Sequence, residues 1–242
     1  MKFLATQCGG EYPERSIPIV LRGKPMSYSR AAFAWLAVVA CAVLLCGVAA
    51  RADEKSSVTS LFDGKTLEGW KKTVFGGEGD VVVRDGCIVL ETGNPLTGIT
   101  WTGKYPKMDY EISLEAKRVN GADFFCALTF PVGEDPCTFV VGGWGGGVVG
   151  LSSLDGFDAS ENETMQYLEF KNDHWYKVRV RVTGGKIEAW LDDKHMVDVE
   201  TKGRQIGIRP EVELSRPLGI SSYMTTAALR DIKIRRLDGK AK

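Results

Sequence analysis

The sequence from about Asp53 onward predicts an all-β domain built as a sandwich of two antiparallel sheets. Three observations predict it: short segments alternate between apolar and polar residues, turn-forming pairs stand between them, and residues 61–237 contain no convincing amphipathic helix. Alternation with a period of two is typical of strands that bury one face. Many short strands with such punctuation favour a sandwich or a barrel, and about 180 residues suffice for one core.

The predicted strands are clearest in four segments. They cover residues 110–116, 176–182, 187–191 and 229–235. The turn-forming pairs are Asp85-Gly86, Asn120-Gly121, Gly184-Gly185 and Asp192-Asp193. Such pairs supply the left-handed backbone that tight hairpins need. We find no internal repeat and no second domain, so one domain over residues 61–237 is expected, preceded by a polar linker at 53–60 and followed by a basic tail at 238–242.

The N-terminal 52 residues have the features of an export signal. Arg30 precedes an uncharged run over residues 31–50, and Ala50-Arg51-Ala52 follows it. A basic flank, an apolar run and such a small-residue site are typical of a secretory signal peptide. We expect residues 1–52 to be an N-terminal extension and signal peptide, cleaved near Ala52. The mature protein would then be periplasmic or extracellular. The alternative is that residues 31–50 stay uncleaved as a membrane anchor.

The charge balance of the remaining chain excludes a nucleic-acid-binding field. Six basic and two acidic residues fall within the first 52, so 25 basic and 29 acidic residues remain of the 31 and 31 in the whole chain. A mildly acidic domain has no surplus of cations for phosphates. The Gly145–Gly150 segment fits G-x-G-x-x-G in form, but it leads into a strand and not a helix. We therefore expect no nucleotide site there.

Three cysteines remain after export: Cys87, Cys126 and Cys137. An oxidising compartment permits a disulfide, and an odd number leaves one thiol unpaired. Residues 124–130 alternate as a strand, and residues 131–136 resemble the turn before Cys137. We therefore expect a cross-strand disulfide between Cys126 and Cys137.

Metal and cofactor ligands are scarce in this sequence. The chain has two histidines and no C-x-x-C pair, so no zinc site is expected. Residues 155–164 concentrate oxygen ligands and could hold calcium, although their spacing fits no EF-hand loop. A polar surface loop is the preferred interpretation. We predict no cofactor.

A ligand cleft can be predicted from open aromatic side chains near a few polar groups. The aromatic candidates are Trp101, Trp144 and Trp190, and the polar ones are Asp123, Asp155, Asn162 and Glu163. Trp190 faces away from its apolar neighbours, and the glycines around Trp144 would leave its ring open. Asp123 follows the Asn120-Gly121 turn, so its carboxylate should emerge at a strand end. The alternative is that each tryptophan only covers a hydrophobic edge and the polar residues are solvated.

Residues 61–70 (LFDGKTLEGW) resemble the opening of the 3-keto-disaccharide hydrolase-like domain family. Further segments resemble the family in the same order as far as residue 237. They are residues 84–88, 100–111, 175–178, 187–193 and 229–235. The resemblance implies a concanavalin-like jelly roll of the lectin and glucanase kind, export, and action on a glycoside, such as a 3-keto-disaccharide. The family's central G-x-N-S-G-I and Y-E-V-Q-I-x-D segments have no counterpart here.

Two functions follow from this resemblance and the predicted cleft. The first is a hydrolase or lyase in which Asp123 or Glu163 removes a proton beside the sugar carbonyl. The second is a non-catalytic carbohydrate-binding module that uses Trp101, Trp144 and Trp190 as platforms, with Asp155 and Asn162 as further contacts. A cell-envelope interaction module without sugar chemistry is the remaining alternative. A carbohydrate is the expected partner, nucleic acid is not, and membrane contact is expected only through an uncleaved N-terminal segment.

Overall fold

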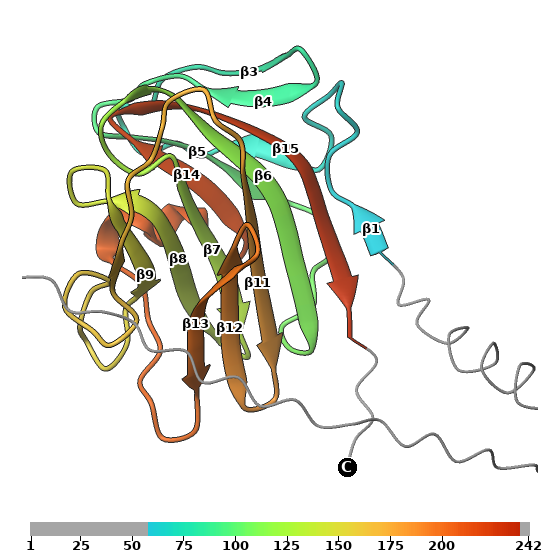
Figure 1. The fold of residues 1–242 in the computed structure, drawn as a ribbon. Helices are drawn as coiled ribbons and strands as arrows, with labels where there is room; N and C mark the ends of the chain where they lie inside the picture. Colours follow the sequence, from blue (N-terminus) through green and yellow to red (C-terminus); the bar gives the residue numbers. More distant parts are fainter. Residues whose placement is uncertain (1–57, 238–242) are drawn as a thin grey trace, which may run out of the picture. The chain divides into compact units, whose positions relative to one another are not determined.

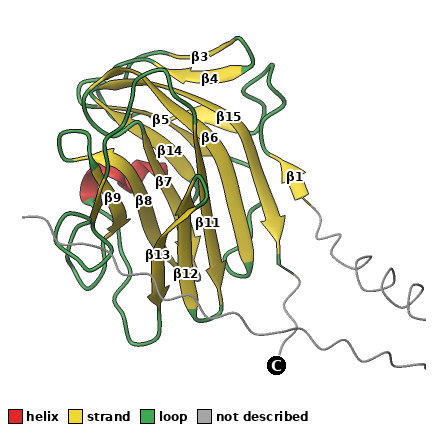
Figure 2. Ribbon diagram, in the orientation of Figure 1, coloured by secondary structure: helices red, strands yellow, loops and turns green. Residues whose placement is uncertain are grey.

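The computed structural model describes residues 58–237, and these form the predicted sandwich of two antiparallel sheets (Figure 1). Almost every element is a strand (Figure 2). The one helical element within the described range is the 3-10 helix η2 (Pro210–Ser215). No helix in this part of the chain is long and apolar enough to cross a membrane. The predicted signal peptide, its cleavage site near Ala52 and the basic tail at 238–242 lie outside the described residues.

One sheet has eight strands. Its order is β13 (Lys194–Glu200), β12 (Lys186–Leu191), β11 (Tyr176–Thr183), β6 (Tyr110–Gly121), β15 (Thr225–Arg236), β4 (Cys87–Leu90) and β3 (Val81–Arg84), and β1 (Val58–Ser60) also pairs with β15. The other sheet has seven strands. Its order is β10 (Gln166–Tyr167), β9 (Val148–Ser152), β8 (Asp135–Gly143), β7 (Cys126–Val132), β14 (Gly219–Tyr223), β5 (Leu96–Trp101) and β2 (Trp70–Lys72).

The core lies between the two sheets and consists of the alternating apolar side chains. In β11, Val178 and Val180 are buried, and they pair with Leu114 and Ile112 of β6. The inner face of the seven-stranded sheet contributes larger side chains, including Phe130 and Phe139. Truncation of one such side chain to alanine typically costs about 2–5 kcal/mol. The alternation that predicted these strands is therefore the pattern that builds the core.

The predicted linker at 53–60 ends too late. Val58, Thr59 and Ser60 form strand β1 and pair with Arg235, Ile234 and Lys233 of β15. All three β1 residues are exposed. An exposed edge strand is held by backbone hydrogen bonds and needs no apolar alternation. The polar sequence of residues 58–60 therefore carries no strand pattern.

The predicted disulfide is wrong. Cys126 and Cys137 are free and buried, although both lie on the inner face of the β7–β8 hairpin. Cys126 pairs with Val141, whereas Cys137 pairs with Phe130. The two positions are therefore four residues apart in the register, or about 13 Å along the strand. A disulfide needs Cα atoms about 4.4–6.8 Å apart. The tight Gly133-Glu134 turn sets a register that the sequence did not reveal.

The outer face of the seven-stranded sheet is hollowed because its side chains are small. Ala127 and Thr138 stand beside Val140 on this face, and Ser152 follows on β9. The segment that contains η2 crosses part of the same face, and Thr100 Oγ1 donates a 3.1 Å hydrogen bond to the Leu214 carbonyl. The part that η2 leaves open holds the pocket described next.

Candidate functional site

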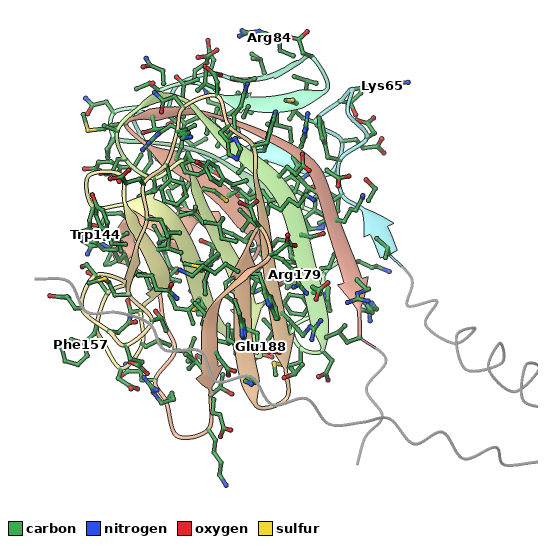
Figure 3. All side chains as sticks on the ribbon, viewed as in Figure 1. Lys65, Arg84, Trp144, Phe157, Arg179 and Glu188 are labelled. Carbon is green, nitrogen blue, oxygen red and sulfur yellow. The ribbon has the colours of Figure 1, made fainter. Side chains whose placement is uncertain are left out.

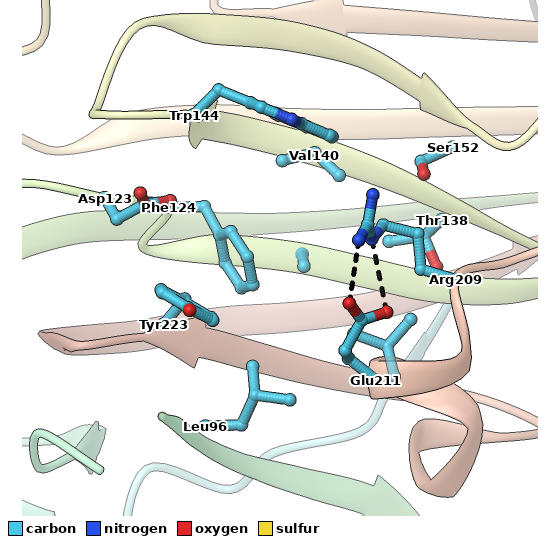
Figure 4. Close-up of a pocket in the computed structure, with 12 residues that line it drawn as sticks. Leu96, Asp123, Phe124, Thr138, Val140, Trp144, Ser152, Arg209, Glu211 and Tyr223 are labelled. Atoms are coloured by element: carbon cyan, nitrogen blue, oxygen red, sulfur yellow. Dashed lines mark hydrogen bonds and ion pairs between the residues drawn. The ribbon is translucent and has the colours of Figure 1, made fainter. Parts of the chain in front are cut away.

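A pocket of about 240 Å3 lies on the outer face of the seven-stranded sheet (Figure 4). Strands β5, β7, β8, β9 and β14 supply its floor, and the β8–β9 turn and η2 supply its sides. Its lining residues are Leu96, Asp123, Phe124, Ala127, Thr138, Val140, Trp144, Ser152, Arg209, Glu211, Val212 and Tyr223.

One end of the pocket is aromatic. Trp144 occupies the β8–β9 turn, Phe124 precedes β7, and Tyr223 ends β14. The rings of Phe124 and Tyr223 lie 5.6 Å apart between centroids. Trp144 is 40% exposed, so its ring can still accept a ligand. Aromatic rings bind the C–H faces of sugars through apolar contact, and this wall offers three of them.

The other end of the pocket is charged. Arg209 Nε and Nη2 donate hydrogen bonds of 3.2 and 2.7 Å to the two carboxylate oxygens of Glu211 (Figure 4). Arg209 Nη1 also donates to Asp158. The hydrogen bond from Arg209 holds the pKa of Glu211 below its ordinary value of 4.5, against the opposing effect of burial. Glu211 is therefore an ionised carboxylate at neutral pH.

Arg209 keeps donor capacity for a ligand. A guanidinium has five N–H donors, and three are used by Glu211 and Asp158. Two N–H groups are left beside the Glu211 carboxylate. The pocket thus combines a base and a donor at one end with an apolar wall at the other, as small-ligand sites do.

Asp123 also lines the pocket, but its two carboxylate oxygens already accept hydrogen bonds. Phe124 N–H donates to Oδ1 at 2.7 Å, and Gly145 N–H donates to Oδ2 at 3.0 Å. The second bond joins the start of β7 to the β8–β9 turn. Asp123 therefore contacts the turn that carries Trp144.

The three predicted tryptophans do not form one cleft. Trp101 packs edge-on against Trp70, with centroids 5.1 Å apart, at the border of the core. Trp190 lies on the outer face of the eight-stranded sheet, between the guanidinium of Arg179 at 3.8 Å and the parallel ring of His195 at 4.7 Å. Figure 3 shows Trp144 away from Arg179. The alternation correctly predicted that the Trp190 side chain points away from the core. It does not predict which of the two sheets has a pocket on its outer face.

The predicted polar residues of the 155–163 loop are also outside the pocket. Arg204 pairs with Asp155 and Glu163, each at 2.6 Å. Asn162 donates to the carbonyls of Leu151 and Asp158, both at 2.8 Å. These side chains fold the loop onto its neighbours. The carboxylates of Asp155 and Glu163 are thus paired with arginine, and the Asn162 amide is used on the backbone.

The glycines beside Trp144 were expected to let the backbone lie close to a neighbour and to leave the indole open. The indole is 40% exposed, and the backbone does approach its neighbours closely. A Cβ on Gly146 would lie 2.7 Å from the Ala122 carbonyl oxygen, and one on Gly147 would lie 2.4 Å from the Tyr167 ring. The glycines therefore let the turn pack closely against its neighbours.

A group of possible metal ligands lies on the outer face of the eight-stranded sheet. Glu188, His195 and Asp198 place their ligand atoms within 4.8 Å of one another. Lys186 Nζ already lies between the two carboxylates, 2.7 Å from Asp198 and 3.9 Å from Glu188. The Lys186 ammonium and the Arg181 guanidinium, 3.9 Å from Glu188, thus balance the two carboxylates.

Ten of the twelve lining residues were not predicted from the sequence; the aromatic and charged ones among them are Phe124, Tyr223, Arg209 and Glu211. Phe124 was expected on the same face as Cys126, but it precedes β7 and lines the pocket, whereas Cys126 lies in the core. Arg209-Pro210-Glu211 falls in a segment without periodicity. The only feature of the sequence that could have indicated this end of the pocket is a basic and an acidic residue, Arg209 and Glu211, on either side of a proline.

A comparison with protein families decides the relationship. The family model of the 3-keto-alpha-glucoside-1,2-lyase-like domain matches residues 57–235. The chain belongs to this family. The family resemblance predicted from residues 61–237 is thereby confirmed. No curated protein matches the chain significantly.

Solved structures that resemble this lyase-like domain are distant in sequence. A Bacillus subtilis protein of unknown function with a galectin-like fold has a TM-score of 0.53 and 11% identity, over 74% of this chain and 94% of that one. The Emp46p carbohydrate recognition domain has a TM-score of 0.50 and 12% identity, over 74% and 93%. A candidate glycosyl hydrolase of Parabacteroides distasonis has a TM-score of 0.47 and 18% identity, over 75% and 94%. The first two support the jelly-roll fold.

Proposed function

We propose that this lyase-like domain binds a glycoside with a ketone at C3 in the pocket on the seven-stranded sheet and cleaves its C1–O bond. The observation that carries the proposal is the position of the Arg209–Glu211 pair, opposite Phe124 and Trp144 across one pocket. Its volume of about 240 Å3 is below the 300–1,000 Å3 of pockets for drug-sized ligands, which suits one sugar ring. The family description supplies the class of reaction.

In the proposed reaction Glu211 acts as the base. A ketone at C3 acidifies the C–H bond at C2, and a carboxylate can remove such a proton. The electron pair of that bond forms an enolate whose charge lies on the C3 oxygen. The two remaining N–H groups of Arg209 can stabilise this charge. The C3=O bond then re-forms, the electron pair moves to make the C1=C2 double bond, and the C1–O bond breaks. The departing alkoxide takes a proton from water, and the hydroxide that remains takes the proton from Glu211.

A binding-only role is the second candidate. The observation that favours it is that Arg209 donates a hydrogen bond to each carboxylate oxygen of Glu211. A base that is held so tightly has a lowered pKa and is weak. In this alternative the pair only donates to and accepts from sugar hydroxyls, while the aromatic wall supplies the affinity.

One experiment separates the two candidates. The purified protein is incubated with a 3-keto-α-glucoside and, in parallel, with its unoxidised parent, and released alcohol is followed chromatographically. Release from the 3-keto compound alone supports cleavage next to the ketone. Binding of both compounds without release supports the binding role, and the absence of binding contradicts the proposal as a whole.

We also propose that the protein acts outside the cytoplasm. The support is the apolar run at residues 31–50 with its basic flank and Ala50-Arg51-Ala52. N-terminal sequencing of exported material would give a start near Asp53, whereas an uncleaved run in the membrane fraction would contradict cleavage.

A further inference from the structure

The turn that carries Trp144 is strained. Trp144 has a φ of 48°, and Gly145 and Gly146 follow with 84° and 105°. A bulky residue rarely adopts the left-handed region, and surrounding contacts must hold it there. Two hydrogen bonds within the turn, both 3.1 Å from the N–H groups of Gly146 and Gly147 to the Gly143 carbonyl, are short-range contacts. Contacts from other parts of the fold must therefore hold the turn in this conformation.

Asp123 holds the turn from the β7 side. Its Oδ2 accepts the N–H of Gly145, the residue directly after Trp144, across 22 positions of sequence. Asp123 is itself anchored, because Phe124 N–H donates to its Oδ1 and its own N–H donates 3.2 Å to Thr225 Oγ1. The carboxylate therefore ties the strained turn to the start of β7, and the Asp123 backbone is anchored on β15.

Arg118 holds the same turn from the β6 side. This side chain is 7% exposed and forms no ion pair among the described residues. Its guanidinium donates to the carbonyls of Phe170 at 2.6 Å and Gly146 at 3.5 Å, and to the Asn172 side chain at 2.8 Å. A buried guanidinium that donates to backbone carbonyls holds those segments of backbone in place. The turn is thus held at Gly145 by an anion and at Gly146 by a cation.

We infer that Asp123 is a positioning residue: its carboxylate, together with Arg118, keeps Trp144 in its left-handed conformation and so presents the indole to the pocket. The proton-abstracting role that the sequence suggested for Asp123 is replaced by this one. The inference rests on the proposed function only for the identity of the ligand. Preorganising a ring before binding reduces the entropy lost on binding, so the effect should appear in affinity and not in turnover.

The first test needs no ligand. Amide hydrogen exchange at Gly145 is measured in the wild type, in Asp123→Asn and in Asp123→Ser. We expect exchange at Gly145 to accelerate at least tenfold in both variants. Asp85→Asn is the matched control, since Asp85 has a φ of 51° at the β3–β4 turn and does not line the pocket. It should leave Gly145 unchanged. Unaltered protection in both Asp123 variants would overturn the inference.

The second test separates positioning from catalysis. With a 3-keto-α-glucoside, Asp123→Asn should raise KM or Kd about five- to tenfold and leave kcat within twofold. A loss of kcat of a hundredfold or more with unchanged Kd would instead show a base. If the wild type binds no glycoside, the proposed function fails, while the exchange result still decides the role of Asp123.

A double-mutant cycle makes the coupling explicit. Trp144→Gly removes the indole and the strain together, because glycine adopts positive φ without cost. Asp123→Asn should then cause no further loss of affinity in the Trp144→Gly background, which is the non-additivity expected of two residues that act through one contact. Additive losses would mean that Asp123 contacts the ligand independently and would contradict the positioning role.

Discussion

Arg209 and Glu211, separated by one proline, form a two-bond ion pair at 2.7 and 3.2 Å at the charged end of the pocket. Pro210 begins η2, so the pair sits where an extended segment turns into a short helix. Asp158 binds the same guanidinium from the β9–β10 loop. The charged end is therefore assembled from two segments about 50 residues apart, and its ionisation depends on Arg209.

The first prediction concerns the pH dependence that this pair sets. Arg209 lowers the pKa of Glu211, so the base stays ionised below pH 4.5. In Arg209→Gln the pKa should rise toward its ordinary value, and the acid limb of kcat/KM should move to higher pH. Arg204→Gln is the control, because Arg204 pairs with Asp155 and Glu163 outside the pocket. An acid limb that is unchanged in Arg209→Gln would show that Glu211 is not the base.

The second prediction concerns the aromatic wall. Trp144→Ala should weaken glycoside binding by about 1 kcal/mol or more, which is at least fivefold in Kd. The reason is that the variant loses the apolar contact between the indole ring and the C–H face of the sugar. Trp190→Ala should leave Kd unchanged, since Trp190 lies between Arg179 and His195 on the other sheet. Isothermal titration with both variants measures this. Equal losses would place the ligand elsewhere.

The sequence predicted the sandwich well because burial of one strand face imposes a period of two. The segments at 176–182 and 187–191 lie in β11 and β12, and their apolar residues face the core as expected. Strand β1 and the register of the β7–β8 hairpin were missed. Both depend on backbone pairing and turn length, which leave little trace in side-chain pattern.

The site was predicted less well. Asp123 and Trp144 do line one pocket, but Trp101, Trp190 and Glu163 belong to three other places. Alternation shows that a side chain leaves the core, yet which outer face is hollow depends on the path of an aperiodic segment. That segment, residues 202–218, also supplies Arg209 and Glu211. A pocket that a loop completes cannot be predicted from strand pattern alone.

The third prediction concerns a buried carboxylate that the proposed reaction does not use. Glu111 is 8% exposed and accepts hydrogen bonds from Arg179, Arg181 and Arg235. Burial opposes its ionisation, but the hydrogen bond from Arg181 and the three positive charges outweigh it, so the pKa of Glu111 lies below 4.5.

A depressed carboxylate pKa stabilises the fold above the unfolded-state pKa and loses that contribution as pH falls through the folded-state value. Glu111→Gln should therefore cost about 2 kcal/mol at pH 7, in the range of hydrogen bonds to charged groups. The difference in Tm between wild type and variant should shrink below pH 4.5. A difference that stays constant from pH 7 to pH 3 would refute this assignment.

The fourth prediction concerns the thiols. Burial raises the pKa of Cys126 and of Cys137 to about 12, so neither is a thiolate at pH 8. Neither should react with iodoacetamide in the native protein, and both should react fully in denaturant without reductant. Peptide mapping of the alkylated purified protein measures this. A disulfide-linked peptide containing both residues would contradict the observed register.

In the reaction that we propose, Glu211 removes the proton at C2 of a 3-keto sugar in this pocket. The most direct measurement is NMR of a 3-keto-α-glucoside incubated with the protein in D2O, which follows loss of the C2 proton signal and formation of the 1,2-unsaturated product. We predict that the wild type causes both, and that Glu211→Gln slows both at least a hundredfold while its Kd stays within threefold. Equal rates in the two proteins, or an intact C2 proton in the presence of bound wild type, would contradict the claim.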